Sequence, residues 1–226
     1  MLGGLDYNDN IVRSIEKYSP VTNSWKYLNK MIDNRKHFST CSLMDNLYII
    51  GGLIGNYTNG HALENCFEFN TKNLKWKELS KMNNARRDMD CSVFEGRIVV
   101  SGGRNNFGIL NTVEAYDHVG DTWENMPNMI NERCGHKSVA VKNKLFVIGG
   151  LYTNNSEVFD STIKNFTLLK QPTGFNLCVP HEVITIGSKI YVFKDIGEVI
   201  IYEFENNEWS LKKCQATRGK ALFFLC

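Results

Sequence analysis

Residues 86–103 read RRDMDCSVFEGRIVVSGG, and this stretch decides the fold. A short apolar run, 91–94, is followed by the polar pair Glu95-Gly96 and by a second apolar run that ends at Gly102-Gly103. Two such runs around a tight polar turn are typical of a β-hairpin. Glycine directly after the second run indicates a backbone that turns with unusual φ and ψ in little space.

The same arrangement returns along the chain. Double glycines stand at 3–4, 51–52, 102–103 and 149–150, so the successive spacings are 48, 51 and 47 residues. In three cycles an aromatic residue is followed by Trp after seven residues, Met after six more, Arg after four more and the double glycine after another 16. The aromatic pairs are Tyr18–Trp25, Phe69–Trp76 and Tyr116–Trp123, with a later pair at Tyr202–Trp209. Spacings that stay fixed over several cycles indicate a repeat architecture.

Each cycle contains four β-strand patterns, and four antiparallel strands in about 50 residues are typical of one propeller blade. We therefore predict an all-β propeller of about five four-stranded blades. Cycle four has Phe166 in place of Trp, cycle five has Lys194-Asp195 in place of the double glycine, and cycle one lacks its first strand and most of its second. The predicted repeats are approximately 1–34, 35–85, 86–132, 133–174 and 175–217, followed by a closing strand at 218–226.

These residues resemble Kelch repeats, in particular those of the metazoan Kelch-like (BTB-Kelch) ubiquitin-ligase adaptors. The resemblance rests on the double glycines, the aromatic-to-Trp step and the segments 14–18, 111–116 and 145–150. It implies a C-terminal strand that closes the N-terminal blade. It also implies either a complete five-bladed ring or a six-bladed ring that lacks one blade. We expect no BTB or BACK region in this sequence.

Composition narrows the class of partner. Lys and Arg number 26 against 24 Asp and Glu, which leaves a net charge of +2, so neither nucleic acid nor an anionic membrane is expected as a partner. The apolar runs are too short to span a bilayer, and no secretory signal precedes them, so we expect a cytoplasmic protein. The seven cysteines show no C-x-x-C spacing and are expected to be reduced, with Cys41 and Cys91 as core residues.

The sequence favours a binding protein over an enzyme. Its five histidines show no metal-ligand spacing, and no nucleophile elbow or phosphate-binding loop is present, so neither a metal nor a cofactor is expected. The Kelch resemblance includes copper oxidases and sialic-acid epimerases, but their His, Tyr and Cys placements do not match here.

Strand alternation indicates where a partner would bind. The connections from second to third strand and from blade to blade share one face, and their length varies while the other turns stay short. Rigid scaffolds usually bind through such loops. In the resembling adaptors this face binds short, often acidic, degron peptides. The candidate partner-binding residues are Arg35, Arg86, Arg87, Arg104, Asn105, Asn106, Arg133, His136, Tyr152 and Arg218.

Each candidate also has a structural alternative. A repeated Arg can hydrogen-bond loop carbonyls or pair with a neighbouring acid such as Asp33, Asp88 or Glu132. His136 can pack at the start of a strand. The loop aromatics Tyr7, Tyr57 and Tyr152 can be binding hot spots if exposed or loop anchors if not.

The leading hypothesis is a protein-interaction propeller that recognises a substrate peptide for a cullin-RING ubiquitin ligase. A cullin would be reached only through a BTB region, which this sequence does not contain. Two alternatives remain open. The chain can be an actin-binding cytoskeletal scaffold, or a truncated Kelch protein that competes for the substrate.

Overall fold

The computed structural model describes residues 3–4, 6–8, 10–55, 60–194 and 197–213. The predicted closing strand at 218–226, and Arg218 with it, lies outside the described residues. Regular structure in the described part consists of β-strands, joined by turns and short loops. None of the described segments forms a helix that could cross a bilayer.

The strands form five successive antiparallel sheets, which we name blades I to V. Blade I has two strands, β1 (Ser14–Ser19) and β2 (Ser24–Lys30). The remaining four blades each have four strands, ordered as in the sequence. Blade II consists of β3 (Ser39–Leu43), β4 (Asn46–Ile50), β7 (Cys66–Asn70) and β8 (Trp76–Leu79). Blade III consists of β9 (Asp90–Phe94), β10 (Arg97–Ser101), β11 (Val113–Asp117) and β12 (Thr122–Met126).

Blades IV and V repeat this plan. Blade IV consists of β13 (Lys137–Val141), β14 (Lys144–Ile148), β15 (Ser156–Asp160) and β16 (Asn165–Leu168). Blade V consists of β17 (Glu182–Ile186), β18 (Lys189–Phe193), β19 (Glu198–Glu203) and β20 (Glu208–Lys213). A small extra hairpin, β5 (Leu53–Ile54) with β6 (His61–Ala62), lies in the loop between β4 and β7. Sequence patterning did not predict this hairpin.

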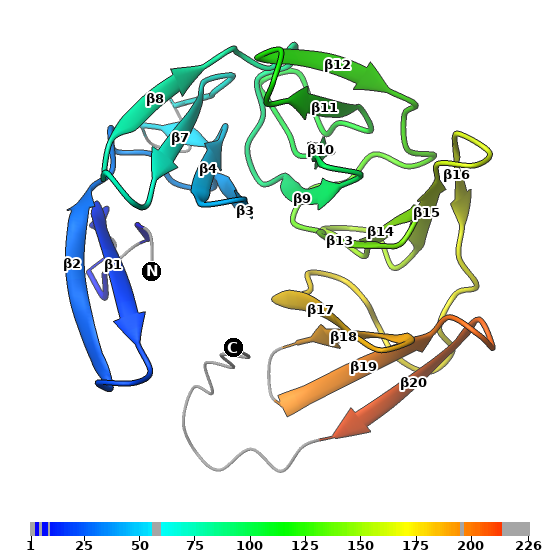
Figure 1. The fold of residues 1–226 in the computed structure, drawn as a ribbon. Helices are drawn as coiled ribbons and strands as arrows, with labels where there is room; N and C mark the ends of the chain where they lie inside the picture. Colours follow the sequence, from blue (N-terminus) through cyan, green and yellow to red (C-terminus); the bar gives the residue numbers. More distant parts are fainter. Residues whose placement is uncertain (1–2, 5, 9, 56–59, 195–196, 214–226) are drawn as a thin grey trace.

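Figure 1 shows the five sheets arranged around a central axis, with the first strand of each complete blade innermost. Neighbouring first strands contact one another, β3 with β9, β9 with β13, and β13 with β17. The predicted all-β propeller is confirmed. Within the described ranges, blade I has only its third and fourth strands, as expected from the missing half of cycle one.

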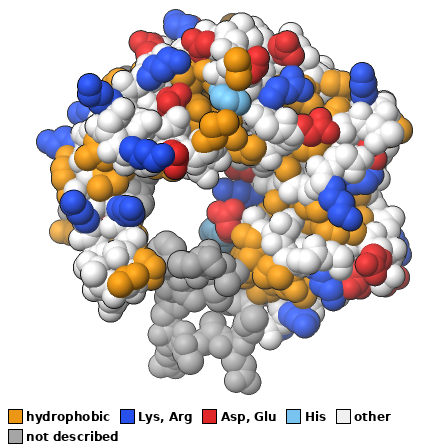
Figure 2. Space-filling model, viewed as in Figure 1, with side chains coloured by type: hydrophobic (Ala, Val, Ile, Leu, Met, Phe, Trp, Pro, Cys, Tyr) orange, Lys and Arg blue, Asp and Glu red, His pale blue; other side chains and the backbone are white. Residues whose placement is uncertain are grey.

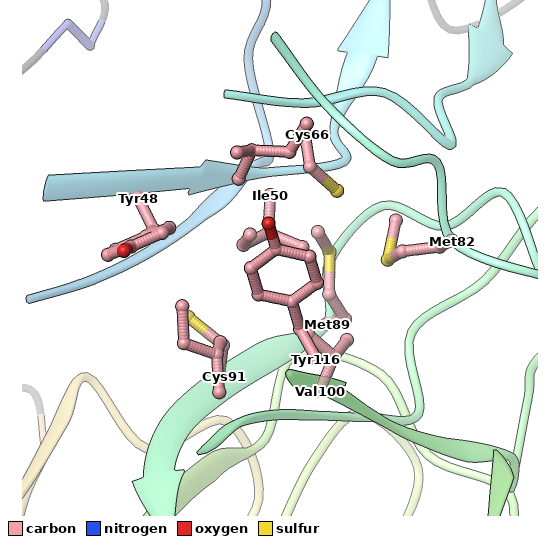
Figure 3. Close-up of a cluster of buried hydrophobic side chains, with 10 residues drawn as sticks. Tyr48, Ile50, Cys66, Met82, Met89, Cys91, Val100 and Tyr116 are labelled. Carbon is pink, nitrogen blue, oxygen red and sulfur yellow. The ribbon is translucent and has the colours of Figure 1, made fainter. Parts of the chain in front are cut away.

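The hydrophobic core lies between the blades. Between blades II and III, Tyr48, Ile50 and Cys66 face Val100 and Tyr116 (Figure 3). In every blade the repeated aromatic residues are cross-strand partners on the two outer strands, with ring centroids 4.8 to 5.2 Å apart. The four tryptophans therefore occupy equivalent positions, as predicted.

Three of the tryptophans also tie their blade to the preceding one. The indole N–H of Trp76 donates to the carbonyl of Lys30 at 3.0 Å. Trp123 bonds in the same way to Ser80 at 2.9 Å, and Trp209 to Lys170 at 2.7 Å. Trp25 has no described blade before it, and 48% of it is exposed. The repeated Trp thus fills the space between blades wherever a preceding blade is present.

The double glycine marks the contact with the next blade. Gly102 has a φ of +55°, and a Cβ atom there would lie 2.4 Å from the carbonyl oxygen of Arg133. Its neighbour Gly103 donates its N–H to that same oxygen at 2.8 Å. Glycine is required because the next blade's backbone crosses where a side chain would begin.

The cysteines agree with the expected core role. Cys66 and Cys91 are buried and Cys41 is half-buried, and all three are free thiols. Burial raises the pKa of Cys66 to about 12, so this thiol stays protonated and packs as a small apolar side chain.

Candidate interaction face

Two faces of the ring differ in what their connections present. We call the side with the connections 52–65, 103–112 and 150–155 the loop face, and the side with the hairpin turns inside each blade the turn face. The blade-to-blade connections, which carry the repeated arginines, also lie on the loop face. The candidate site was predicted here.

The repeated arginines hold the bases of these loops. Arg86 donates from Nη1 to the carbonyl of Gly102 at 2.7 Å, where the loop begins, and to that of Thr112 at 3.0 Å, where the loop ends. Arg35 does the same with Gly51 and Asn65 at 2.8 and 3.0 Å. The same donor of Arg133 bonds Gly149 and Asn155 at 2.8 and 3.1 Å. We call this arrangement the arginine clamp.

Buried acids complete two of the three clamps. Glu114 pairs with Arg86, and Glu157 pairs with Arg133, and all four side chains are 0% exposed. The carboxylate of Glu114 also accepts the backbone N–H groups of Asn83 and Asn84. Burial lowers the pKa of Arg86, and the nearby Glu114 opposes that shift. The pair therefore fixes the segment that leads into blade III.

The clamp of blade II is built differently. Phe67 occupies the position two residues before the repeated aromatic, where blades III and IV have glutamate. Arg35 lies over the ring of Phe67, 4.8 Å from its centroid, and pairs with Asp33 at 2.6 Å. A cation–π contact and a local carboxylate thus replace the buried ion pair.

These contacts correct part of the predicted site. Arg35, Arg86 and Arg133 are 0 to 1% exposed, so they do not face a ligand as one basic cluster, and the alternative of bonds to loop carbonyls is confirmed. Sequence reasoning also missed Glu114 and Glu157. A signal was present, since both stand two residues before the repeated aromatic. The neighbouring acids were only partly right, because Asp33 pairs with Arg35 but Asp88 pairs elsewhere.

His136 is likewise an interior residue. It is 2% exposed, and its Nε2 lies 2.9 Å from the hydroxyl of Ser101. Burial and the nearby Arg133 lower its pKa well below the usual value, so the ring is neutral at pH 7. The structure therefore supports the strand-start alternative over contact with a ligand.

Arg104 remains partly accessible on the loop face, at 34% side-chain exposure. Its Nε donates to Asp88 at 2.7 Å, and His37 contacts the other carboxylate oxygen of Asp88 at 2.8 Å. Burial raises the pKa of Asp88, but the hydrogen bonds and charges of His37 and Arg104 lower it by a larger amount. The net shift is downward, so the carboxylate is charged at pH 7. The half-buried Arg87 pairs with Arg104 through backbone bonds of 2.8 and 2.9 Å.

Two backbone hydrogen bonds join the entries of blades II, III and IV. His37 and Asp88 both have a positive φ, as does Gly135, and each stands two residues after a repeated arginine. Asp88 donates its N–H to the carbonyl of His37 at 3.0 Å, and Gly135 donates to that of Asp88 at 2.7 Å. Backbone hydrogen bonds therefore link the entries of three neighbouring blades on the loop face.

A groove of about 280 Å³ lies beside Arg104, between blades II and III. Amide side chains and one exposed ring dominate its lining, which consists of Ala62, Asn83, Asn84, Ala85, Asn105, Asn106 and Phe107. We call it the asparagine groove. Asn105 holds the loop tip, because its side chain accepts the N–H of Phe107 at 2.9 Å and its own N–H donates to Gly108. The predicted Asn105 and Asn106 thus share one groove.

Exposed aromatic side chains mark the loop tips. Phe107 is 98% exposed, Tyr7 is 95% exposed and Tyr152 is 88% exposed. Tyr57 lies outside the described residues. Phe107 was missed because only tyrosines were considered among the loop aromatics. In the described residues no three His, Cys, Asp or Glu side chains gather as a possible metal site.

Comparison with known proteins agrees with this architecture. The family model described as the KLHDC2/KLHL20/DRC7 Kelch-repeats domain matches residues 1–150. A solved structure titled "Structure of YjhT" is similar in fold, with a TM-score of 0.65, 16% identity, and coverage of 81% of this chain and 66% of that chain.

Several curated proteins are similar in sequence. Kelch repeat protein C2 of vaccinia virus (strain Western Reserve) is 30% identical over 84% of this chain and 36% of its own length. Kelch-like protein 26 of Danio rerio is 25% identical over 92% of this chain and 37% of its own length. Kelch repeat and BTB domain-containing protein 1 of horsepox virus is 27% identical over 74% and 30%. The chain spans about a quarter to just over a third of the length of such relatives.

Proposed function

This chain belongs to the Kelch-repeat family, and on that premise we propose that it is a protein-interaction propeller that holds a peptide segment of another protein on its loop face. The observation that carries the proposal is the asparagine groove with Phe107 at its edge. Asparagine side chains can donate to and accept from a peptide backbone. An exposed aromatic ring beside them supplies apolar contact area at little entropic cost.

The chemistry of the groove refines the expected partner. Three arginines are buried in clamps, and the partly exposed Arg104, directly before the groove residue Asn105 in the sequence, already pairs with Asp88. Recognition by amides and aromatic rings therefore outweighs recognition by positive charge. We propose a peptide bound in extended form, with at most one acidic residue placed near Arg104.

We further propose that the bound protein is a substrate presented to a cullin-RING ubiquitin ligase. This step rests on similarity to relatives whose names include a BTB domain, of which the chain covers less than a third. Its test is co-precipitation of a cullin with the full-length gene product. Recovery of the partner without any cullin would leave only the interaction role.

Selection from a phage-displayed peptide library tests the loop face. Phe107→Ser should abolish binding of the selected peptides. Val119→Ser is the matched control, because Val119 is 84% exposed and lies in the turn between β11 and β12, on the turn face of the same blade. Peptides that bind the Phe107 variant as tightly as the parent would place the site elsewhere.

A further inference from the structure

A larger cleft lies on the turn face, between blades IV and V. Its volume is about 640 Å³, within the range of about 300–1,000 Å³ typical of ligand sites. Seven apolar side chains from both blades contribute to its walls, namely Val141, Phe146, Val158, Leu168, Leu169, Tyr202 and Phe204. We call it the IV/V cleft. Figure 2 shows hydrophobic side chains at the surface where these two blades adjoin.

One hydrogen bond that joins blades II and III has no counterpart between blades IV and V in the described residues. In blade III, Asp121 accepts the hydroxyl of Tyr116 at 2.6 Å and also the N–H of Ser80 from blade II at 2.9 Å. The counterpart in blade V is Asn207, which accepts the hydroxyl of Tyr202 at 2.9 Å. Within the described residues, Asn207 takes no hydrogen bond from blade IV. The two blades are therefore held less closely at this point.

The walls of the cleft suit one large apolar side chain. The ring of Phe204 lies 5.2 Å from that of Phe146 and 5.8 Å from that of Tyr202, so three aromatic rings pack together in its wall, with Phe204 the least buried of them. Leu168, on the outer strand of blade IV, is 52% exposed. Aromatic rings arranged in this way accept a further ring or a branched aliphatic group in offset or edge-on contact.

Charge at the rim is unequal on the two sides. Lys144 pairs with Asp160, and Lys189 pairs with Glu203 at 2.8 Å. Hydrogen bonding by Glu203, together with the charge of the nearby Glu205, raises the pKa of Lys189, so Glu203 and Glu205 both lie near a cation. Lys142 is exposed and forms no ion pair with any residue in the described ranges. An anionic group is therefore favoured on the blade IV side, beside Lys142.

We propose that the IV/V cleft binds a short segment of a partner protein, which packs one large apolar side chain against Leu168 and Phe204 and places a carboxylate beside Lys142. This site is separate from the asparagine groove, because it lies on the opposite face and between different blades. A propeller with both sites can hold one protein on each face.

Two small probes test the chemistry of this cleft on the intact chain. N-acetyl-L-tryptophan has the ring and the carboxylate, whereas N-acetyl-L-tryptophanamide has only the ring. Titrations followed by NMR should shift signals of residues 141–146, 167–169 and 202–207 in a saturable manner. The carboxylate probe should bind about two- to five-fold more tightly than the amide, as expected for one exposed ion pair.

Variants separate the apolar and the charged contributions. Leu168→Asp should abolish the saturable shifts, and the exposure of Leu168 makes this change tolerable for folding. Lys142→Asn should remove the preference for the carboxylate while leaving binding of the amide unchanged. Asparagine is suitable because Lys142 has a φ of +53°, a conformation that asparagine tolerates.

Lys164→Asn is the matched control. Lys164 is exposed, has a φ of +52°, lies in the turn between β15 and β16 of the same blade, and is not part of the cleft lining. It should leave both affinities unchanged. Shifts that persist in the Leu168 variant, shifts spread over the loop face, or equal affinity for the two probes would each overturn the proposal.

Discussion

Glu114→Phe would test how strongly the buried carboxylate stabilises the clamp of blade III. Glu114 is 0% exposed and pairs with Arg86, so its removal leaves a buried guanidinium without its counter-ion. Breaking a buried ion pair by removing one partner costs about 3–5 kcal/mol of folding free energy. The backbone N–H groups of Asn83 and Asn84 would lose their acceptor as well.

Blade II supplies the compensating change. There Phe67 stands in place of glutamate, and Asp33, two residues before Arg35, pairs with the arginine. The corresponding change in blade III is Asn84→Asp, two residues before Arg86. In the Glu114→Phe background it should restore about 1.5–3 kcal/mol through a charge-assisted bond. In the parent it should destabilise, because a carboxylate at position 84 would lie beside Glu114, which now accepts the Asn84 side-chain amide at 3.0 Å.

Urea unfolding of the parent, the two single variants and the double variant at pH 7 measures this cycle. The expected coupling energy is at least about 2 kcal/mol, near the upper part of the range for residues in contact. Steric strain from the larger phenylalanine is present with and without the second change, so it largely cancels in the coupling. A coupling below about 0.5 kcal/mol, the limit within which independent sites are additive, would refute the account of the clamp.

Three further predictions concern the repeat itself, and thermal or urea unfolding checks each of them. Gly102→Ala should lower the free energy of unfolding by about 2–5 kcal/mol, because backbone strain and a clash with the next blade add. Gly96 has a φ of +75° but open space around it, so Gly96→Ala should cost only about 1–2 kcal/mol. Equal costs would contradict the argument that the next blade's backbone crosses at Gly102. Trp123→Phe should lower the free energy of unfolding by about 1–3 kcal/mol, because it removes a hydrogen bond between blades. Trp25→Phe should cost less than about 0.5 kcal/mol, because Trp25 is half exposed. The reverse order would contradict this account. As the pH falls from 6.5 to 5, the free energy of unfolding of the parent should decrease by up to about 1.4 kcal/mol per pH unit, because His136 is protonated only in the unfolded chain and its folded pKa is lowered. His136→Asn should remove this pH dependence. An unchanged slope would show that other groups cause it.

The sequence was sufficient for the fold because its strongest signals are local and repeated. The step from Tyr116 to Trp123 sets a cross-strand pair, and Gly102-Gly103 sets a backbone crossing, so each motif reports on its immediate surroundings. The small β5–β6 hairpin escaped prediction because its strands have two residues each and no periodicity can be read from them.

The site was harder to predict because a repeated residue and a binding residue look alike in one sequence. The partner of Arg86 lies 28 residues away in strand β11, so only the assembled blade shows that the charge is paired in the interior. Arg104, Asn105 and Asn106 were predicted from their place after a double glycine; the structure puts Asn105 and Asn106 in the lining of the asparagine groove and pairs Arg104 with Asp88. At the IV/V interface, Asn207 stands at the position that Asp121 has in blade III, and the missing hydrogen bond to the preceding blade is visible only in the assembled structure.

The arginine clamp has a consequence for how this scaffold can change over evolution or by engineering. Because one guanidinium bonds the carbonyls at both stems of a loop, the stems are held together without help from the tip segment between them. Insertions, deletions or complete exchange of that segment should therefore be tolerated by the blade, both in evolution and in engineered variants. Blades II, III and IV carry tip segments of different length above the same pair of arginine-to-carbonyl bonds. A tip segment transplanted from one blade to another should therefore leave the propeller folded and transfer its binding specificity.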